Sequence, residues 1–151
     1  MRIVGVLLIL TSMFACRQTT KVTGEKELGT NVPAPKSEQS CYAYIKEKDT
    51  AQLILITTGV VATGELNYKW FEKDKSTGHI AGEMRGDTLI ANYTFNSEGK
   101  QSVRQVAFLK KGNQFLEGFG EIQEKEGKMQ FKDLKKIDYE KAIVFEKIAC
   151  N

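Results

Sequence analysis

The sequence is short of the residues from which metal centres are built. Its 151 residues include one histidine and three cysteines, which excludes a metal site made from a cluster of His and Cys ligands. An excess of one charge is also lacking, because 22 basic residues are interspersed with 19 acidic ones. This balance gives no extended field that would attract nucleic acid or an anionic membrane surface. The 41% hydrophobic content is that of an ordinary folded protein, and the length leaves room for one domain.

The N-terminal apolar run is too short to cross a bilayer. It extends from Ile3 to Leu10 behind a single positive charge at Arg2 and continues weakly to Ala15, whereas a spanning helix needs about 20 apolar residues. A positive charge followed by roughly 7 to 15 apolar residues is typical of a secretory signal peptide. We therefore expect residues 1–15 to be a signal peptide that is removed on export. The alternative is a buried N-terminal helix.

A cysteine directly follows this segment. Ala15 and Cys16 resemble the lipobox of bacterial lipoproteins, in which a small residue precedes a cysteine that is acylated before cleavage. The resemblance implies that Cys16 carries fatty acids such as palmitate, so that the mature protein is anchored to a membrane without spanning it. Residues 17–20 match neither the inner-membrane retention signal nor the surface-export signal of such lipoproteins. An outer-membrane lipoprotein that faces the periplasm is therefore implied.

Two cysteines remain once Cys16 is assigned to the lipid. An exported protein meets an oxidising compartment, in which an even number of cysteines predicts a disulfide. We therefore predict a bond between Cys41 and Cys150, which would close a loop of about a hundred residues. Two free buried thiols are the alternative.

Residues 16–40 have few apolar side chains and contain both prolines of the chain, Pro33 and Pro35. Such a stretch buries too little apolar surface to offset the entropy lost on ordering. We predict a disordered, flexible tether over these residues, which begins at the lipidated cysteine. The folded domain is expected to cover residues 41–151.

From Cys41 onward the sequence has the pattern of antiparallel β-structure. Short runs rich in Val, Ile, Thr, Tyr and Phe are separated by turn residues at a spacing of roughly 8 to 12. Alternation is clearest over residues 63–70, where Leu66, Tyr68 and Trp70 share one face. The predicted strands are 42–47, 52–57, 60–71, 78–85, 88–96, 102–110, 114–123, 128–133 and 142–149. Tight turns are predicted at four glycines, which adopt positive φ easily: Gly86, Gly99, Gly112 and Gly127.

A long series of hairpins must protect its edge strands, and closing the sheet on itself removes them. The predicted disulfide brings the first and last strands to the same rim, which a simple meander allows only with an even number of strands. Nine predicted strands are compatible with this if residues 134–141 form a connecting excursion, a segment that brings the chain back so that Cys150 lies beside Cys41. We therefore predict an all-β fold: a single antiparallel up-and-down, lipocalin-like barrel of about eight strands.

No residue pattern indicates an active site. His79 is predicted to point outward from a strand, and the dispersed Glu and Lys residues predict a solvated face in which no pair of carboxylates stands out. Gly118 and Gly120 lead into no phosphate-binding loop and are expected to let a strand bend. We therefore predict a protein that is not an enzyme, with no catalytic or metal-binding residues and no cofactor.

One group of aromatic side chains is a candidate for lining a ligand cavity, because eight strands enclose enough space for one small molecule. The same side chains could equally fill the interior as a packed core, and this interpretation is favoured because small barrels are often filled by side chains. The five residues are Tyr68, Trp70, Tyr93, Phe95 and Phe115.

Residues 86–99 (GDTLIANYTFNSEG) and 103–109 (VRQVAFL), with the Cys41-Tyr42 opening and Cys150, resemble a group of small bacterial lipoproteins of unknown function. The resemblance covers residues 41–150 and implies no activity. The plan is also similar to that of the membrane-bound lysozyme inhibitors, but their Ser-Gly-x-x-Tyr inhibitory motif is absent.

The function that we predict is therefore binding. The protein is expected to be a lipid-anchored periplasmic barrel that binds a small apolar ligand or an envelope component, and the alternative is a periplasmic inhibitor or protein-interaction module. Its expected partners are the membrane, through Cys16, and a small ligand or an envelope protein. Nucleic acid is not an expected partner.

Overall fold

The computed structural model describes residues 35–73 and 75–150. The predicted signal peptide, Cys16 and most of the predicted tether lie outside the described residues. No helix in the described part of the chain is long and apolar enough to cross a membrane.

The described residues form a β-structure with one short 3₁₀ helix, η1 (Leu134–Lys136). The strands are β1 (Ser37–Lys46), β2 (Asp49–Thr58), β3 (Val61–Lys69), β4 (Ser76–Arg85), β5 (Thr88–Ser97), β6 (Lys100–Lys111), β7 (Gln114–Phe119), β8 (Ile122–Lys125), β9 (Lys128–Phe131) and β10 (Asp138–Ile148). β1 begins four residues before the predicted start of the domain, because Ser37 to Ser40 pair with β2.

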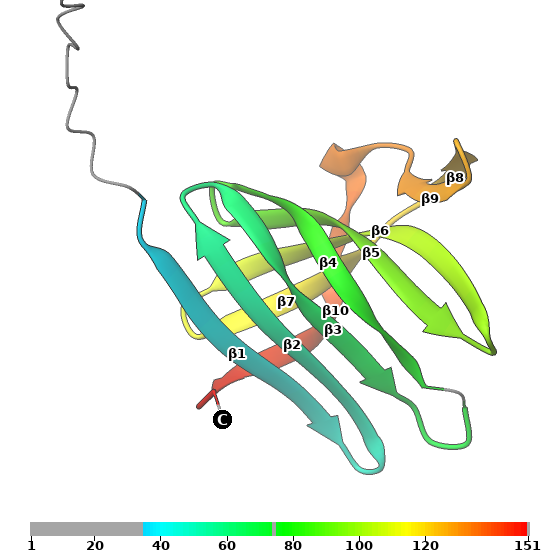
Figure 1. Cartoon of the computed structure of the whole chain (residues 1–151), viewed down its shortest axis with the longest axis horizontal. Helices are drawn as coiled ribbons and strands as arrows, with labels where there is room; N and C mark the ends of the chain where they lie inside the picture. The colour runs from blue at the N-terminus through cyan, green and yellow to red at the C-terminus, as the bar shows by residue number, and fades with distance from the viewer. Residues whose placement is uncertain (1–34, 74, 151) are drawn as a thin grey trace, which may run out of the picture. The chain divides into compact units, whose positions relative to one another are not determined.

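Eight of these strands form a closed antiparallel barrel. Strands β1 to β7 pair in sequence order, β10 follows beside β7, and β10 then pairs with β1 to close the sheet (Figure 1). The all-β class, the antiparallel arrangement and the count of eight barrel strands are therefore confirmed.

The excursion that returns the chain differs from the predicted one. It begins at Gly120 and contains the β8–β9 hairpin and η1, whereas the prediction placed it over residues 134–141. All four residues of β8 are exposed, so this segment has no apolar face with which to join the barrel wall. The predicted strand 114–123 accordingly ends at Phe119. The hairpin lies at one end of the barrel, where β9 runs parallel to β6 with Met129 opposite Arg104 (Figure 1).

The barrel interior is packed with aromatic and aliphatic side chains. Alternate residues of each strand point inward, as the period of two predicts. Phe115 makes edge contacts with Tyr42 and Phe108, with ring centroids 4.9 and 6.3 Å apart. The largest fully buried side chains are Tyr93, Phe108, Phe115, Phe145, Leu53, Leu66, Ile80 and Leu89.

The disulfide lies at the narrow seam that closes the barrel. β1 and β10 pair through three residue pairs only, starting with Cys41 opposite Ile148. Cys150 follows two residues later and is bonded to Cys41, with the Cα atoms 5.3 Å apart. The predicted Cys41–Cys150 bond is confirmed, and it joins the first and last barrel strands covalently.

The predicted glycine turns are also confirmed, with φ angles between 57 and 74° at Gly86, Gly99, Gly112 and Gly127. Two of these turns also hold a glutamate at positive φ. Glu98 and Glu126 precede Gly99 and Gly127 with φ angles of 51 and 54°. Two successive positive φ angles are typical of the type I′ turn, which matches the twist of the strands that it joins.

Candidate functional site

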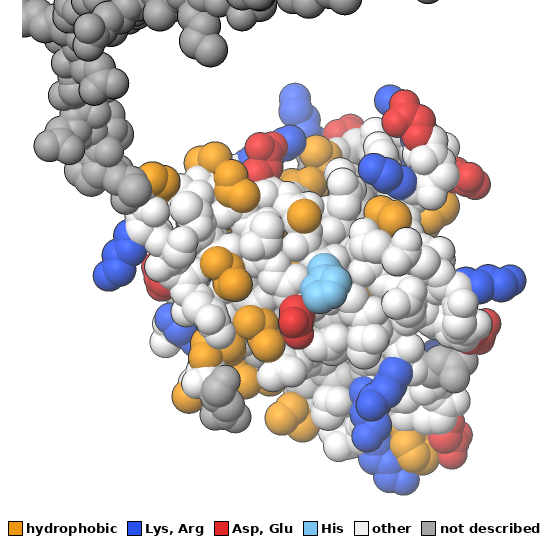
Figure 2. All heavy atoms as spheres, in the orientation of Figure 1, with side chains coloured by type: hydrophobic (Ala, Val, Ile, Leu, Met, Phe, Trp, Pro, Cys, Tyr) orange, Lys and Arg blue, Asp and Glu red, His pale blue; other side chains and the backbone are white. Residues whose placement is uncertain are grey.

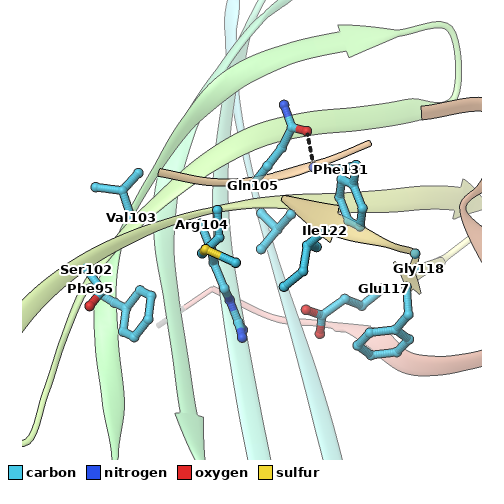
Figure 3. A pocket seen from close by; sticks show the side chains of 13 residues that line it. Phe95, Ser102, Val103, Arg104, Gln105, Glu117, Gly118, Ile122 and Phe131 are labelled. Carbon is cyan, nitrogen blue, oxygen red and sulfur yellow. Dashed lines mark hydrogen bonds between the residues drawn. The ribbon is translucent and has the colours of Figure 1, made fainter. Parts of the chain in front are cut away.

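A pocket of about 370 Å³ lies where β6 and β7 separate. These strands pair only from Ala107 to Lys111 of β6, and the first half of β6 has β9 as its neighbour on that side. The pocket opens in this gap (Figure 3). Its apolar lining consists of Phe95, Val103, Val106, Phe119, Ile122, Met129 and Phe131, and its only charged lining residues are Arg104 and Glu117.

Polar contacts hold the β8–β9 hairpin beside the pocket. The backbone N–H of Phe131 donates a 3.2 Å hydrogen bond to Oε1 of Gln105 on β6 (Figure 3). Lys132 donates through its backbone N–H to the carbonyl of Glu121 at 2.9 Å, and its ammonium forms an ion pair with the Glu121 carboxylate at 3.1 Å. The first contact ties the hairpin to β6 beside the gap that β7 leaves open, and the two Lys132–Glu121 contacts join the ends of the hairpin to each other.

Gly118 and Gly120 allow the chain to leave the barrel wall beside the pocket. A Cβ atom at Gly118 would overlap the ring of Tyr139 and the side chain of Ile137, so only glycine lets these side chains pack against β7. A Cβ atom at Gly120 would approach the Phe131 ring to 3.2 Å. The bending predicted for these glycines stays a prediction, and what the structure shows at both positions is close contact with neighbouring side chains.

Glu117 is the one charged residue among the described residues that is buried, with 3% of its surface exposed. It lies in phase with Phe115 on β7 and therefore points into the barrel. Its Oε1 accepts a 2.7 Å hydrogen bond from the Tyr68 hydroxyl. Burial raises the pKa of Glu117, and the Tyr68 hydrogen bond and the charge of Arg104 oppose that rise.

Arg104 extends from β6 into the same space, in phase with Val106 and Phe108 (Figure 3). Its guanidinium carbon lies 5.3 Å from the centroid of the Tyr68 ring and 5.5 Å from those of Tyr93 and Phe95. Such distances are those of cation–π contacts. Burial also raises the pKa of Tyr93 to about 12, although the charge of Arg104 acts in the opposite direction.

Three buried polar atoms of this cluster have no hydrogen-bond partner within the described residues: Nε of Arg104, Oε2 of Glu117 and the Tyr93 hydroxyl. No other buried side-chain nitrogen or oxygen in the described part of the chain is left in this way. An unpaired buried polar group costs about 1 to 3 kcal/mol. Since Arg104 and Glu117 line an apolar pocket, the arrangement suits a ligand that supplies partners for their two atoms, whereas Tyr93 lies in the core behind Arg104.

The structure separates the five aromatic residues predicted to line a cavity. Phe95 lines the pocket, and Tyr68 and Tyr93 lie behind it in contact with Arg104. Trp70 packs on Tyr44 and Tyr68 at the edge of the core, and Phe115 is fully buried.

Sequence reasoning missed Arg104 and Glu117, the two charged residues of the pocket. Glu117 was included in the general prediction that the dispersed Glu and Lys residues form a solvated face, which does not hold for it, and Arg104 was not singled out. A signal was available, because each has a buried apolar residue two positions away on the same face of its strand, Val106 for Arg104 and Phe115 for Glu117. A charged residue in such a phase is an exception to the pattern and marks a candidate site.

His79 is exposed on the outer face of β4, where its backbone pairs with Glu65 of β3 (Figure 2). Among the described residues, no group of three or more His, Cys, Asp or Glu side chains is placed to hold a metal ion. The chain matches no family model, no curated protein sequence and no solved structure.

Proposed function

We propose that this protein is a non-enzymatic binding module that takes a small, largely apolar ligand in the pocket between β6, β7 and the β8–β9 hairpin. The observation that carries the proposal is that two buried polar atoms without a partner in the described residues, Nε of Arg104 and Oε2 of Glu117, belong to residues that line this apolar space. A volume of about 370 Å³ falls in the lower part of the range of ligand sites, roughly 300 to 1,000 Å³.

The proposal includes the cellular location inferred from the sequence. The segment before the barrel resembles a lipoprotein signal that ends at Cys16, and the Cys41–Cys150 disulfide is compatible with an oxidising compartment. We propose an exported lipoprotein, anchored in the outer membrane and facing the periplasm, whose barrel binds an apolar molecule of the envelope.

A protein-interaction module is the second candidate. It is favoured by the exposure of apolar side chains at the pocket rim, where 45% of Phe119 and 51% of Ile122 are accessible. The same exposure also suits the entrance of a small-molecule site, and a rim alone does not use the buried Arg104 and Glu117. We therefore place ligand binding first.

Titration with the neutral dye N-phenylnaphthylamine tests the proposal. The Cys16→Ser chain is used, because its described residues are unchanged and no detergent is then needed. We expect saturable binding that Ser102→Trp weakens about tenfold or more, since Ser102 lines the pocket and a large side chain there fills it. Thr63→Trp, on the exposed outer face of β3, is the matched control and should bind as the parent does. Equal weakening by both variants, or no binding by the parent, would contradict the proposal.

A further inference from the structure

The two charged residues of the pocket carry an inference about the ligand itself, which rests on the proposed function. Arg104 and Glu117 bring one positive and one negative charge to the lining, so the site is balanced without a charged ligand. Neither residue forms an ion pair within the part of the chain that the structure describes. The two groups project into the same space from β6 and β7 (Figure 3).

The free atoms of these residues define what a ligand must offer. Oε1 of Glu117 is already occupied by the Tyr68 hydroxyl, which leaves Oε2 as an acceptor. Nε of Arg104 is a donor without a partner in the described residues. A polar group that both donates and accepts hydrogen bonds offers the complement of each atom.

We infer that the pocket selects an uncharged amphiphile, with a hydroxyl or carboxamide head between Arg104 and Glu117 and an apolar body against Phe95, Ile122 and Phe131. A carboxylate head would meet the Glu117 carboxylate, and an ammonium head would meet the Arg104 guanidinium, so either ion places like charges together in a partly buried site. Water molecules would satisfy the polar atoms but would leave the apolar lining uncovered.

A matched set of ligands tests this inference: octanol, octanamide, octanoate and octylammonium, which share their alkyl chain and differ in the head. Displacement of N-phenylnaphthylamine from the Cys16→Ser chain at neutral pH reports their affinities. We expect octanol and octanamide to bind about tenfold more tightly than either ion. If no member of the set binds, the proposed site fails. If the set binds but octanoate or octylammonium binds most tightly, the site stands and the uncharged head is overturned.

Two variants in the same background show whether the charges set the preference. Glu117→Gln leaves Arg104 uncompensated, so octanoate should gain about tenfold relative to octanol. Arg104→Gln leaves Glu117 uncompensated, so octylammonium should gain by a similar factor. Arg104→Lys keeps the charge and should keep the order of the parent. Glu124→Gln and Lys128→Gln change the same net charges on exposed residues outside the pocket and should leave the order unaltered.

Circular dichroism and urea unfolding identify any variant that fails to fold. If one of Glu117→Gln and Arg104→Gln does not fold, the other one tests whether the charges set the preference. A folded Glu117→Gln or Arg104→Gln variant that retains the parent's order of affinities would overturn the role assigned to these charges.

Discussion

The Tyr68 hydroxyl donates a 2.7 Å hydrogen bond to the buried carboxylate of Glu117, across 49 residues of sequence. This contact joins β3 to β7 through the barrel interior and holds one carboxylate oxygen in place, while the other has no partner among residues 35–73 and 75–150. The relationship makes Glu117 a fixed acceptor at the base of the pocket. The first two predictions below follow from it.

Removing the hydroxyl in Tyr68→Phe leaves a buried carboxylate without its neutral donor. We expect the free energy of unfolding at pH 7 to fall by about 2 kcal/mol, the usual size for a hydrogen bond to a charged group. Urea unfolding measures the change. Tyr44→Phe is the matched control, because no hydrogen bond of the Tyr44 hydroxyl is found within the described residues, and it should cost about 0.5 kcal/mol or less. Equal losses in the two variants would contradict the role of the Tyr68 contact.

The raised pKa of Glu117 predicts a pH dependence of stability. Its pKa lies above the ordinary value of 4.5, so between these two values the folded state binds more protons than the unfolded state. The free energy of unfolding therefore falls as pH rises through this window, by up to about 1.4 kcal/mol for each unit by which the pKa is raised. The stability that comes from the protonated form of Glu117 is fully present below pH 4.5 and is lost as pH rises through the raised pKa.

Glu117→Gln has no titrating carboxylate at this position and should lose that slope. We expect the parent's free energy of unfolding minus that of the variant to decrease as pH rises from 4 to 8. Urea unfolding at several pH values measures this difference. The exposed Glu124→Gln is the control and should show a nearly constant difference. A difference for Glu117→Gln that grows with pH would mean that the carboxylate is stabilised in its charged form, contrary to the raised pKa.

The disulfide is expected to contribute strongly to stability, because it joins the two ends of the barrel across a separation of 109 residues. Loop entropy gives an upper figure of about 4.7 kcal/mol for a loop of this size. Cys41→Ser with Cys150→Ser should lower the free energy of unfolding by several kcal/mol, in urea without reductant. Adding dithiothreitol should destabilise the parent and leave the double variant unchanged. If reductant does not affect the parent, the bond does not form in the protein.

The proposed acylation of Cys16 makes a prediction about location. In bacterial cells, the full chain should incorporate radiolabelled palmitate and sediment with the outer membrane, because acyl chains hold a protein durably on a bilayer. Cys16→Ser should lose the label and leave the membrane fraction. Membrane association that persists in Cys16→Ser, or label that is absent from the full chain, would contradict acylation at this residue.

The sequence predicted the barrel well because its determinants are local. Alternation in β3 and the glycine turns predict hairpins. The Cys41–Cys150 bond requires the first and last strands to meet at one rim, which an even number of strands in a closed sheet allows. The excursion was misplaced because residues 122–123 were included in the predicted strand 114–123 and residues 128–133 were counted as a further strand. Only packing shows that β8 and β9 have no fully buried face.

The pocket was harder to predict because it depends on contacts between distant segments. Arg104 and Glu117 come from the consecutive strands β6 and β7, but Tyr68 lies 49 residues before Glu117 and meets both residues only across the barrel interior. Five aromatic residues were the candidate lining, with a packed core as the favoured interpretation, and Phe115 and Tyr93 are indeed packed inside the core. Charged residues in the inward phase of β6 and β7 were the more informative signal.

The central claim is that a small molecule binds between β6, β7 and the β8–β9 hairpin. Amide chemical shifts of the Cys16→Ser chain, followed by nuclear magnetic resonance during titration with octanol, test it most directly. We predict saturable shifts concentrated at residues 102–106, 117–122 and 129–131, with little change across β2 and the outer face of β3. Shifts absent at saturating octanol, or concentrated away from these three segments, would contradict the account.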